Sequence, residues 1–312
     1  SKLAYLFSGI VIGIGILLIA IQGLNYGVDF KGGRAYVVTF HEPVDATDLK
    51  NDLTESFEGA GTEVKNLGGN NIVKVVTSYI IDDEAETADE KVKSTLIAGL
   101  EKSTGLKYVA DDSKVDAAHF AIPNSTKVGA NVADDTKAAS LQATILSLLA
   151  IFIYILVRFR KWQFSAGAVA ALAHDALFVI ASFAIVRVFG ISFEIDQVFI
   201  AAILTVIGYS INDTVIIFDR IREYLAMGTS HDRAKIFNDA INSTLNRTII
   251  TSGTVLLVVI ALLFFGGEVL RGFSFALLVG VVPGTHSSIF MAGPIVRDFD
   301  KMDNKRAGAR QE

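Results

Sequence analysis

The sequence contains no cysteine, only four prolines and a single tryptophan in 312 residues. The absence of cysteine excludes disulfide bonds and thiolate metal sites. Charged residues are also sparse, at 20%, while hydrophobic residues reach 51% and the mean hydropathy is +0.47. Ordinary soluble domains are less apolar than this. The composition therefore argues against a soluble domain and favours a membrane protein.

Several apolar runs are long enough to cross a bilayer, which requires roughly 20 residues. Six such runs lie at about 3–22, 138–157, 164–186, 197–218, 248–265 and 273–296. We therefore predict an α-helical polytopic membrane protein with one helix for each run. A large soluble helical protein is the alternative, but it would need more amphipathic helices and fewer charge-free runs. Because no small-residue cleavage site follows the first run, a retained helix is favoured over a signal peptide.

Basic residues are concentrated on one side of the predicted bundle. The connections 158–162 and 220–246 and the tail 301–312 are rich in lysine and arginine, whereas the opposite short connections hold only Arg187 and Arg271 near their ends. An excess of basic residues in short connections marks the cytoplasmic side of a membrane. We therefore expect cytoplasmic termini and a location outside the cytoplasm for the large segment between the first two helices.

This segment, residues 27–133, has no long apolar run and predicts a separate domain. It follows a first helix within 1–26 and precedes the other helices within 134–300. It holds 18 acidic and 11 basic residues, a net charge of −7, and the rest of the chain holds 15 acidic and 17 basic residues, a net charge of +2. Solubility of an exported domain is sufficient to explain the acidic charge.

The same segment alternates strand and helix patterns. Strands are predicted at 35–40 and in a hairpin over 62–79 that turns at Gly68–Asn71, helices at 45–57 and 85–102, and closing strands within KYVADD and DAAHFAIP. This β-α-β-β-α-β order is that of the ferredoxin-like α+β fold. A fold of this kind does not by itself indicate a function.

The motif GVDFKGG at 27–33 stands where the first helix leaves the membrane. Its glycines, Gly27, Gly32 and Gly33, permit a tight turn and close backbone approach. We favour a turn that leads into a strand over a ligand site that would include Asp29. A phosphate-binding loop is disfavoured because no strand precedes these glycines and no helix follows them.

Asp213 lies inside the apolar run 197–218. A carboxylate at membrane depth costs about 2.5–3.5 kcal/mol on insertion scales, so it should face the bundle interior and find partners there. Ser210 is three residues earlier on the same helix face, and Asn212 is placed to hydrogen-bond a neighbouring helix.

Other runs bring polar residues to comparable depth. Arg247 is the preferred partner of Asp213, and Asp219 is the carboxylate that competes with Asp213 for Arg247. Thr251 and Thr254 follow Arg247 on the same helix face. His174 and Asp175 lie near the middle of the third run. The sixth run contains Thr285, His286, Ser287 and Ser288 after Pro283, which should kink that helix.

A single polar residue inside a membrane helix could be structural, but the combination of these residues favours a proton or ion route. A carboxyl group that loses and regains an arginine neighbour can bind and release a proton.

Two packing features are also predicted. Gly9 and Gly13 form a small-residue face on the first helix, and residues 234–247 have the spacing of an interfacial helix. The sequence shows no nucleophile triad, metal-spaced cluster or Walker loop. We therefore expect no enzyme activity, no cofactor, no metal and no nucleic-acid partner.

Four stretches closely resemble the SecF members of the SecD/SecF family of protein-export membrane proteins. They are GVDFKGG (27–33), GYSINDTVIIFDRIRE (208–223), LNRTIITS (245–252) and FFGGEVLRGFSFALLVG (264–280). The resemblance implies a membrane fold of the resistance-nodulation-division (RND) type, with six helices from each of SecD and SecF. It identifies Asp213, Arg247 and Thr251 as the family's proton-pathway residues. The start at Ser1 also fits the SecF half of a fused SecD–SecF chain.

The resemblance further implies use of the proton motive force, together with SecD, to promote export and release of unfolded preproteins through SecYEG, with YajC and YidC as further partners. Two alternatives stay open. One is half of a small-molecule or lipid exporter of the same superfamily, which the small outer segment disfavours. The other is a passive scaffold that stabilises SecD.

Overall fold

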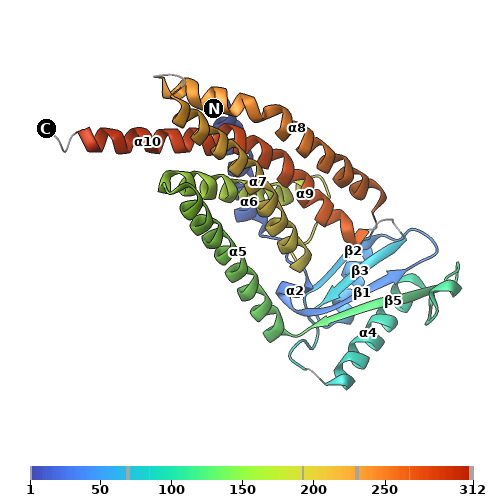
Figure 1. Cartoon of the computed structure of the whole chain (residues 1–312). Coiled ribbons are helices and arrows are strands. Elements are labelled where there is room, and N and C mark those ends of the chain that lie inside the picture. The colour runs from blue at the N-terminus through green and yellow to red at the C-terminus, as the bar shows by residue number, and fades with distance from the viewer. Residues whose placement is uncertain are drawn as a thin grey trace. The chain divides into compact units, whose positions relative to one another are not determined.

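The structure, a computed structural model, describes residues 2–67, 71–83, 85–191, 193–228, 232–266 and 268–308. The chain divides into two compact units (Figure 1). One comprises residues 26–140, and the other residues 1–25 together with 141–312. The unit of residues 26–140 corresponds to the predicted outer segment 27–133 and is called the outer unit for that reason. Its last residues belong to a helix that continues into the other unit.

The outer unit is an α+β domain. It contains α2 (Val28–Lys31), β1 (Gly33–Thr39), α3 (Ala46–Ser56), β2 (Thr62–Asn66), β3 (Ile72–Thr77), α4 (Glu86–Thr104), β4 (Lys107–Val109), a 3-10 turn η1 (Asp112–Lys114) and β5 (His119–Val128). Asp45 caps α3 by accepting hydrogen bonds from the backbone amides of Thr47 and Asp48, as the sequence predicts. Part of the predicted hairpin turn, residues 68–70, lies outside the described residues.

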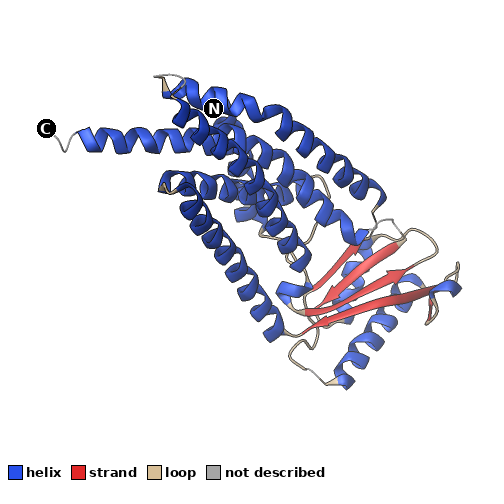
Figure 2. Cartoon of the chain, in the orientation of Figure 1, coloured by secondary structure: helices blue, strands red, loops and turns tan. Residues whose placement is uncertain are grey.

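The strands form one mixed sheet in the order β2-β3-β1-β5-β4 (Figure 2). β1 pairs antiparallel with β3 and β5, β2 pairs antiparallel with β3, and the short β4 is parallel to β5. The ferredoxin-like arrangement is thus confirmed, with β5 beside β1 and β4 added at the edge. α3 and α4 pack on the sheet through a core that includes Leu53, Leu96, Val38, Val75 and Phe120.

The described residues of the chain contain six helices long and apolar enough to cross a membrane, which confirms the predicted number. They are Leu3–Gln22, Ala130–Phe159, Trp162–Val188, Gln197–Met227, Arg233–Phe265 and Leu270–Asp300. The first four correspond to α1 (Lys2–Gln22), α5 (Ala130–Phe159), α6 (Trp162–Val188) and α7 (Gln197–Met227), and the fifth to α8 (Arg233–Phe265).

The predicted interfacial helix 234–247 is wrong as a separate element. These residues are the first half of α8, which continues without a break to Phe265. No proline or glycine interrupts residues 233–252, so nothing ends the helix at the membrane boundary. Phe237 and Ala240 pack in a core with Ile217 and Phe218 of α7, where an interfacial helix would have turned them to lipid. The predicted connection 220–246 is accordingly mostly helical.

The sixth span changes its hydrogen-bond pattern along its length. α9 (Glu268–Ser287) remains α-helical through Pro283, then a π-helical turn η2 (Ser288–Ala292) leads into α10 (Gly293–Gly308). Figure 1 shows α10 leaving the direction of α9 after this turn. The irregularity expected at Pro283 therefore appears five residues later, in a π-helical turn of the kind often found at functional sites.

The packing glycine of α1 is not one of the predicted pair. A Cβ at Gly9 or Gly13 would meet nothing within 4 Å, whereas a Cβ at Gly15 would overlap Ala181 of α6. Ser8 and Gly15, two turns apart, are the buried positions of this helix. The Gly9–Gly13 face therefore points away from the rest of this chain.

Candidate functional site

Asp213 lies on the inner face of α7, and only 2% of its surface is exposed. Its Oδ2 atom is buried without a hydrogen-bond partner among the described residues. The Ser252 hydroxyl of α8 lies within hydrogen-bonding reach of this carboxyl group. The prediction that Asp213 faces the bundle interior is confirmed, and its incomplete hydrogen bonding sets it apart because buried polar atoms usually have partners.

Asp175 forms a second buried site on α6, and its side chain is fully enclosed. Its Oδ2 atom accepts hydrogen bonds from Ser210 Oγ of α7 at 2.7 Å and from Ser287 Oγ of α9 at 2.9 Å. Its Oδ1 atom lies 3.0 Å from Nδ1 of His174. One carboxyl group thus joins three membrane helices, α6, α7 and α9.

His174 is only 7% exposed, and its Nε2 atom is buried without a partner in the described part of the chain. The residues expected near the middle of the third span are therefore brought to the interior together with Ser210. Ser210 and Asp213 share the buried face of α7, as the spacing predicts, and the Ser210 hydroxyl donates to Asp175 across the helix interface.

Gly284 of α9 explains how the helices come so close here. A Cβ at this position would lie 3.2 Å from Ser210 Oγ and 3.5 Å from Asp175 Oδ2. A larger residue would push α9 away from α6 and α7, because these contacts are already tight. The glycine therefore permits the short hydrogen bond between Ser287 and Asp175.

Hydroxyl groups link the other helices around Asp213. Ser252 Oγ of α8 lies 2.7 Å from Thr285 Oγ1 of α9 and accepts a hydrogen bond from the Tyr209 hydroxyl of α7 at 3.3 Å. Thr214 Oγ1 lies 2.9 Å from Ser288 Oγ. Ser252, Tyr209 and Thr214 were not among the predicted site residues. Each is a hydroxyl residue on a helix, and the sequence does not show which helix face is turned inward. Only the packing shows that these three hydroxyl groups lie inside the bundle.

α8 presents a different face from the one predicted. Thr244, Thr248 and Ser252, at intervals of four residues, are buried, whereas Arg247 is exposed and Thr251 only half-buried. The Thr251 hydroxyl donates to the backbone carbonyl of Arg247 in its own helix at 2.8 Å. Arg247 and Thr251 are thus not brought into the network of buried hydroxyls.

The expected ion pair is also not formed. Among the described residues, no contact within 4.0 Å joins Arg247 to Asp213 or to Asp219. Asp219 instead pairs with Arg158 and Arg222, each at 3.0 Å. Asn212, expected to bond a neighbouring helix, is exposed on a different face of α7 from Asp213, because adjacent helical residues point about 100° apart.

The GVDFKGG motif forms the tight turn that the sequence predicts. Gly27 precedes the single turn α2, Gly32 has φ 70° and Gly33 has φ 125°. A Cβ at Gly33 would lie 2.7 Å from the Thr77 carbonyl oxygen of β3. Both the positive φ and this close approach favour glycine. Asp29 is half-buried in α2.

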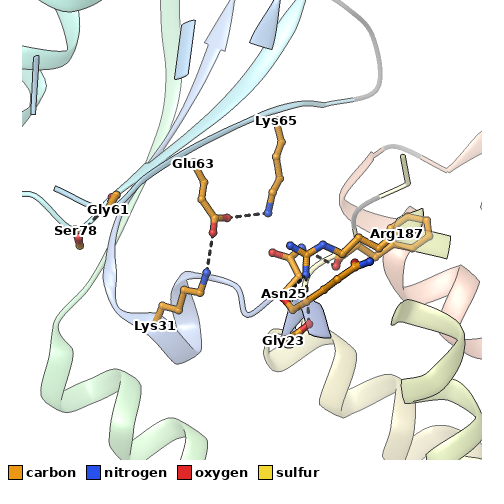
Figure 3. Close-up of polar contacts among 10 residues, drawn as sticks. Gly23, Asn25, Lys31, Gly61, Glu63, Lys65, Ser78 and Arg187 are labelled. Atoms are coloured by element: carbon orange, nitrogen blue, oxygen red, sulfur yellow. Dashed lines mark hydrogen bonds and ion pairs between the residues drawn. The ribbon is translucent and has the colours of Figure 1, made fainter. Parts of the chain in front are cut away.

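Charged residues hold the motif to the sheet (Figure 3). Lys31 Nζ donates to Glu63 of β2 at 2.7 Å, and Lys65 Nζ donates to the same carboxylate at 2.9 Å. Burial would raise the pKa of Glu63, but the hydrogen bonds and charges of the two lysines outweigh it and lower this pKa from 4.5 to about 2. The carboxylate is therefore ionised across the physiological range.

Arg34, directly after the motif, was missed by the sequence analysis. It is 3% exposed, pairs with Asp89 at 2.6 Å, and donates to the carbonyl oxygens of Tyr79, Ile80 and Asp83. A buried arginine with this many acceptors fixes the loop after β3. An arginine at the start of a strand carries no local signal of such a role.

The end of α1 has its own anchor, also drawn in Figure 3. Arg187 Nη1, at the end of α6, donates to the carbonyl oxygens of Gln22 and Gly23 at 3.2 and 3.3 Å. Asn25 donates to the Phe193 carbonyl oxygen at 2.9 Å and accepts from the Ile195 amide at 2.8 Å. A cation at the carboxyl end of a helix also interacts favourably with the helix dipole.

Two family descriptions match the chain. Residues 109–302 match the C-terminal region of the protein export membrane proteins SecD/SecF, and residues 17–44 match the SecD/SecF GG motif. The second match contains the glycine turn at 27–33, and the first contains the buried carboxylates and hydroxyls of α6 to α9.

Similar proteins include two curated SecF subunits of protein translocases. The one from Rhodothermus marinus is 41% identical over 99% of this chain and 93% of its own length. The one from Vibrio alginolyticus is 36% identical over 95% of this chain and 86% of its own length.

Two solved structures also resemble the chain. The crystal structure of SecDF from Thermus thermophilus, titled a translocon-associated membrane protein, has a TM-score of 0.79 at 28% identity over 96% of this chain. A SecDF structure in a super-membrane-facing form has a TM-score of 0.62 at 27% identity over 99% of this chain. This chain spans only 38% of each of those longer chains. The matches to whole SecF subunits and to the family descriptions show that the chain belongs to the SecF proteins of the SecD/SecF family of protein-export membrane proteins.

Proposed function

We propose that this chain, together with SecD, uses the proton motive force to promote export and release of unfolded preproteins through SecYEG. The relatives are named as translocase subunits, so the task is transport and not chemistry on a substrate. We place the chain in the bacterial inner membrane with cytoplasmic termini and a periplasmic outer unit. YajC and YidC are further partners in this proposal.

The observation that carries the proposal is the pair of buried carboxyl groups, Asp213 and Asp175, at membrane depth. Ionisable residues inside membrane segments are costly and commonly mark proton routes. Asp213 is the candidate protonation site, because its Oδ2 atom has no partner in the described structure and can accept a proton or a new hydrogen bond. Asp175 is already bound by Ser210 and Ser287 and is better suited to holding the helices together.

In this proposal, the effect of Arg247 on Asp213 depends on the position of α8. Arg247 is exposed on α8 and forms no ion pair with Asp213 among the described residues. A small rotation or shift of α8 would bring the guanidinium group nearer or take it farther away. Moving one charge across 100 mV provides about 2.3 kcal/mol, which is enough to bias a two-state motion.

The test is release of a secretory protein from spheroplasts depleted of native SecD and SecF. SecD is restored together with either this chain, its Asp213→Asn variant or its Asp219→Asn variant, at matched expression, with and without an uncoupler. Asp219→Asn is the control, because it removes a partly exposed carboxylate from the same helix. We expect Asp213→Asn to abolish the gradient-dependent part of release and Asp219→Asn to retain most of it.

Equal release with the unsubstituted chain and with its Asp213→Asn variant would refute the proton role and support the passive scaffold. The rival exporter of small molecules or lipids predicts instead that preprotein release does not depend on this chain at all. The compact outer unit of residues 26–140 favours the export-accessory function, since the drug pumps of the superfamily have much larger exported domains.

A further inference from the structure

A groove of about 530 Å³ lies between the first half of α8 and the segment formed by η2 and α10. It is lined by Ala234, Phe237, Asn238, Ile241, Asn242, Leu245, Ile289, Phe290, Pro294 and Arg297. None of these residues belongs to the buried network around Asp175 and Asp213. The groove lies at the end of the bundle where the fifth span begins, at Arg233, and the sixth ends, at Asp300. The 33 residues of α8 extend about 50 Å, whereas the hydrocarbon core is about 30 Å thick. The more polar first half of α8, which precedes the apolar run 248–265, therefore reaches beyond the core into the headgroup region.

The fold builds the groove from two regular features. Along α8 the lining residues recur at three- and four-residue intervals, which places them on one face. Opposite them, the π-helical turn presents the adjacent residues Ile289 and Phe290 to the same space. At Gly293 a Cβ would lie 3.1 Å from Ile241 Cδ1, so this glycine lets the two walls meet at the base.

The groove has an apolar floor and a polar rim. Phe237, Ile241, Leu245, Ile289 and Phe290 give an apolar floor, while the side chains of two asparagines and one arginine give a polar rim. Phe290 is 44% exposed, so the floor is open to a ligand.

The rim cation is Arg297, and its one ion pair among the described residues is a weak one within its own helix. Its Nε and Nη2 atoms both donate to Asp298 Oδ1 at 3.1 Å, and the Asp298 side chain is 62% exposed. An ion pair that water reaches contributes little, so an anionic ligand can compete for the guanidinium group. By contrast, Arg233 at the same end of the bundle is paired with Asp300, which is only 17% exposed.

We propose that this groove binds one anionic phospholipid. An acyl chain lies on the apolar floor, and the phosphate accepts hydrogen bonds from Arg297 and from the amide group of Asn238 or Asn242. Arginine suits this role because its planar fork of N–H donors matches phosphate oxygens, and basic pockets between helices at the cytoplasmic surface are typical headgroup sites. The site is independent of the proton route proposed above.

The sequence contains a single tryptophan, so a variant with one tryptophan at a chosen position can report on lipid binding there. In a Trp162→Phe background, Phe290→Trp places the one fluorophore in the groove, and Leu257→Trp places it on a 71% exposed position of α8 as a reference. The full chain is reconstituted in two kinds of bilayer. One mixes brominated phosphatidylglycerol with unlabelled phosphatidylcholine, and the other mixes unlabelled phosphatidylglycerol with brominated phosphatidylcholine. Quenching by each brominated lipid gives the relative binding constant at each reporter.

At the groove reporter we expect phosphatidylglycerol to bind about fivefold more tightly than phosphatidylcholine, as one basic residue near the surface provides. The ratio should fall to about one in Arg297→Gln and persist in Arg297→Lys, which keeps the charge. Arg220→Gln, at a cation paired with Glu223 outside the groove, should leave it unchanged. The Leu257→Trp reporter should show no preference.

Three outcomes would overturn the proposal. One is an equal preference at the two reporters, which would mean that lipid selection is general. Another is a preference that survives Arg297→Gln. The third is an absence of quenching at the groove reporter by either lipid, which would mean that protein and not lipid covers this groove.

Discussion

Asp175 accepts hydrogen bonds from two serines of neighbouring helices, whereas Asp213 Oδ2 is buried without a partner in the described structure. The two carboxyl groups therefore differ in what their removal should do. Loss of Asp213 mainly removes a group that can take up a proton. Loss of Asp175 leaves the Ser210 hydroxyl and His174 without this partner, whereas the Ser287 hydroxyl keeps its hydrogen bond to the Gly284 carbonyl oxygen. Unsatisfied buried groups are costly.

We predict that Asp175→Ala lowers the free energy of unfolding by about 2–3 kcal/mol, because it removes the shared partner of several buried polar groups. Asp175→Asn should cost less, about 1 kcal/mol, since its carbonyl oxygen still accepts one hydrogen bond. Thermal unfolding of the purified chain in lipid nanodiscs measures both. Asn212→Ala, at an exposed position, is the control and should change stability by less than about 0.5 kcal/mol. A loss from Asp175→Ala no larger than the control's would contradict the helix-joining role.

At the scale of the helices, close contact depends on small residues at positions that the packing selects. α1 meets α6 at Gly15 and Ala181, and α9 approaches α6 and α7 at Gly284. Ser287, the last residue of α9, bonds Asp175, and Ser288, the first residue of the π-helical turn, bonds Thr214. The irregular end of the sixth span thus contributes to both buried polar contacts.

Gly15→Val and Gly13→Val form a matched pair on α1. Valine at position 15 would overlap Ala181, while position 13 has open space within this chain. We expect Gly15→Val to cost about 1–3 kcal/mol through overpacking and Gly13→Val to have little effect on the chain alone. The melting temperatures of the two variants in lipid nanodiscs, each compared with that of the unsubstituted chain, measure this difference. Equal melting temperatures would show that α1 is not held at Gly15.

At the scale of the whole molecule, acidic residues are concentrated in the outer unit. The net charge of −7 over residues 27–133 contrasts with +2 for the remainder. In the outer unit, Glu63 joins the α2 turn to β2 through two lysines, and its folded pKa of about 2 lies below the ordinary value of 4.5. A depressed folded pKa means that ionised Glu63 stabilises the fold above pH 4.5, and that this contribution is lost as pH falls toward 2.

We therefore predict that acidification from pH 4.5 to 2 weakens the outer unit, and that Lys31→Gln removes part of this pH dependence. The contribution is about 1 kcal/mol after solvent screening, since the pair is partly exposed. Amide hydrogen exchange in β2 and β3, corrected for its intrinsic pH dependence, measures it. Lys50→Gln, an exposed lysine on α3, serves as the control. Identical profiles for the Lys31 and Lys50 variants would argue against the Glu63 anchor.

The sequence by itself determined the six spans, the inserted α+β unit, the glycine turn at 27–33 and the inward position of Asp213, because hydrophobic length, strand and helix periodicity, and the cost of a buried charge are properties of local sequence. Only the tertiary structure decided which side chains meet. Ser252 replaced Thr251, Gly15 replaced Gly9 and Gly13, and Arg247 stayed outside the network. Each of these outcomes depends on the rotation of a helix about its axis, which changes by about 100° per residue and is set by the neighbouring helices. A nearly uniform apolar run leaves that rotation undetermined until the neighbours pack against it.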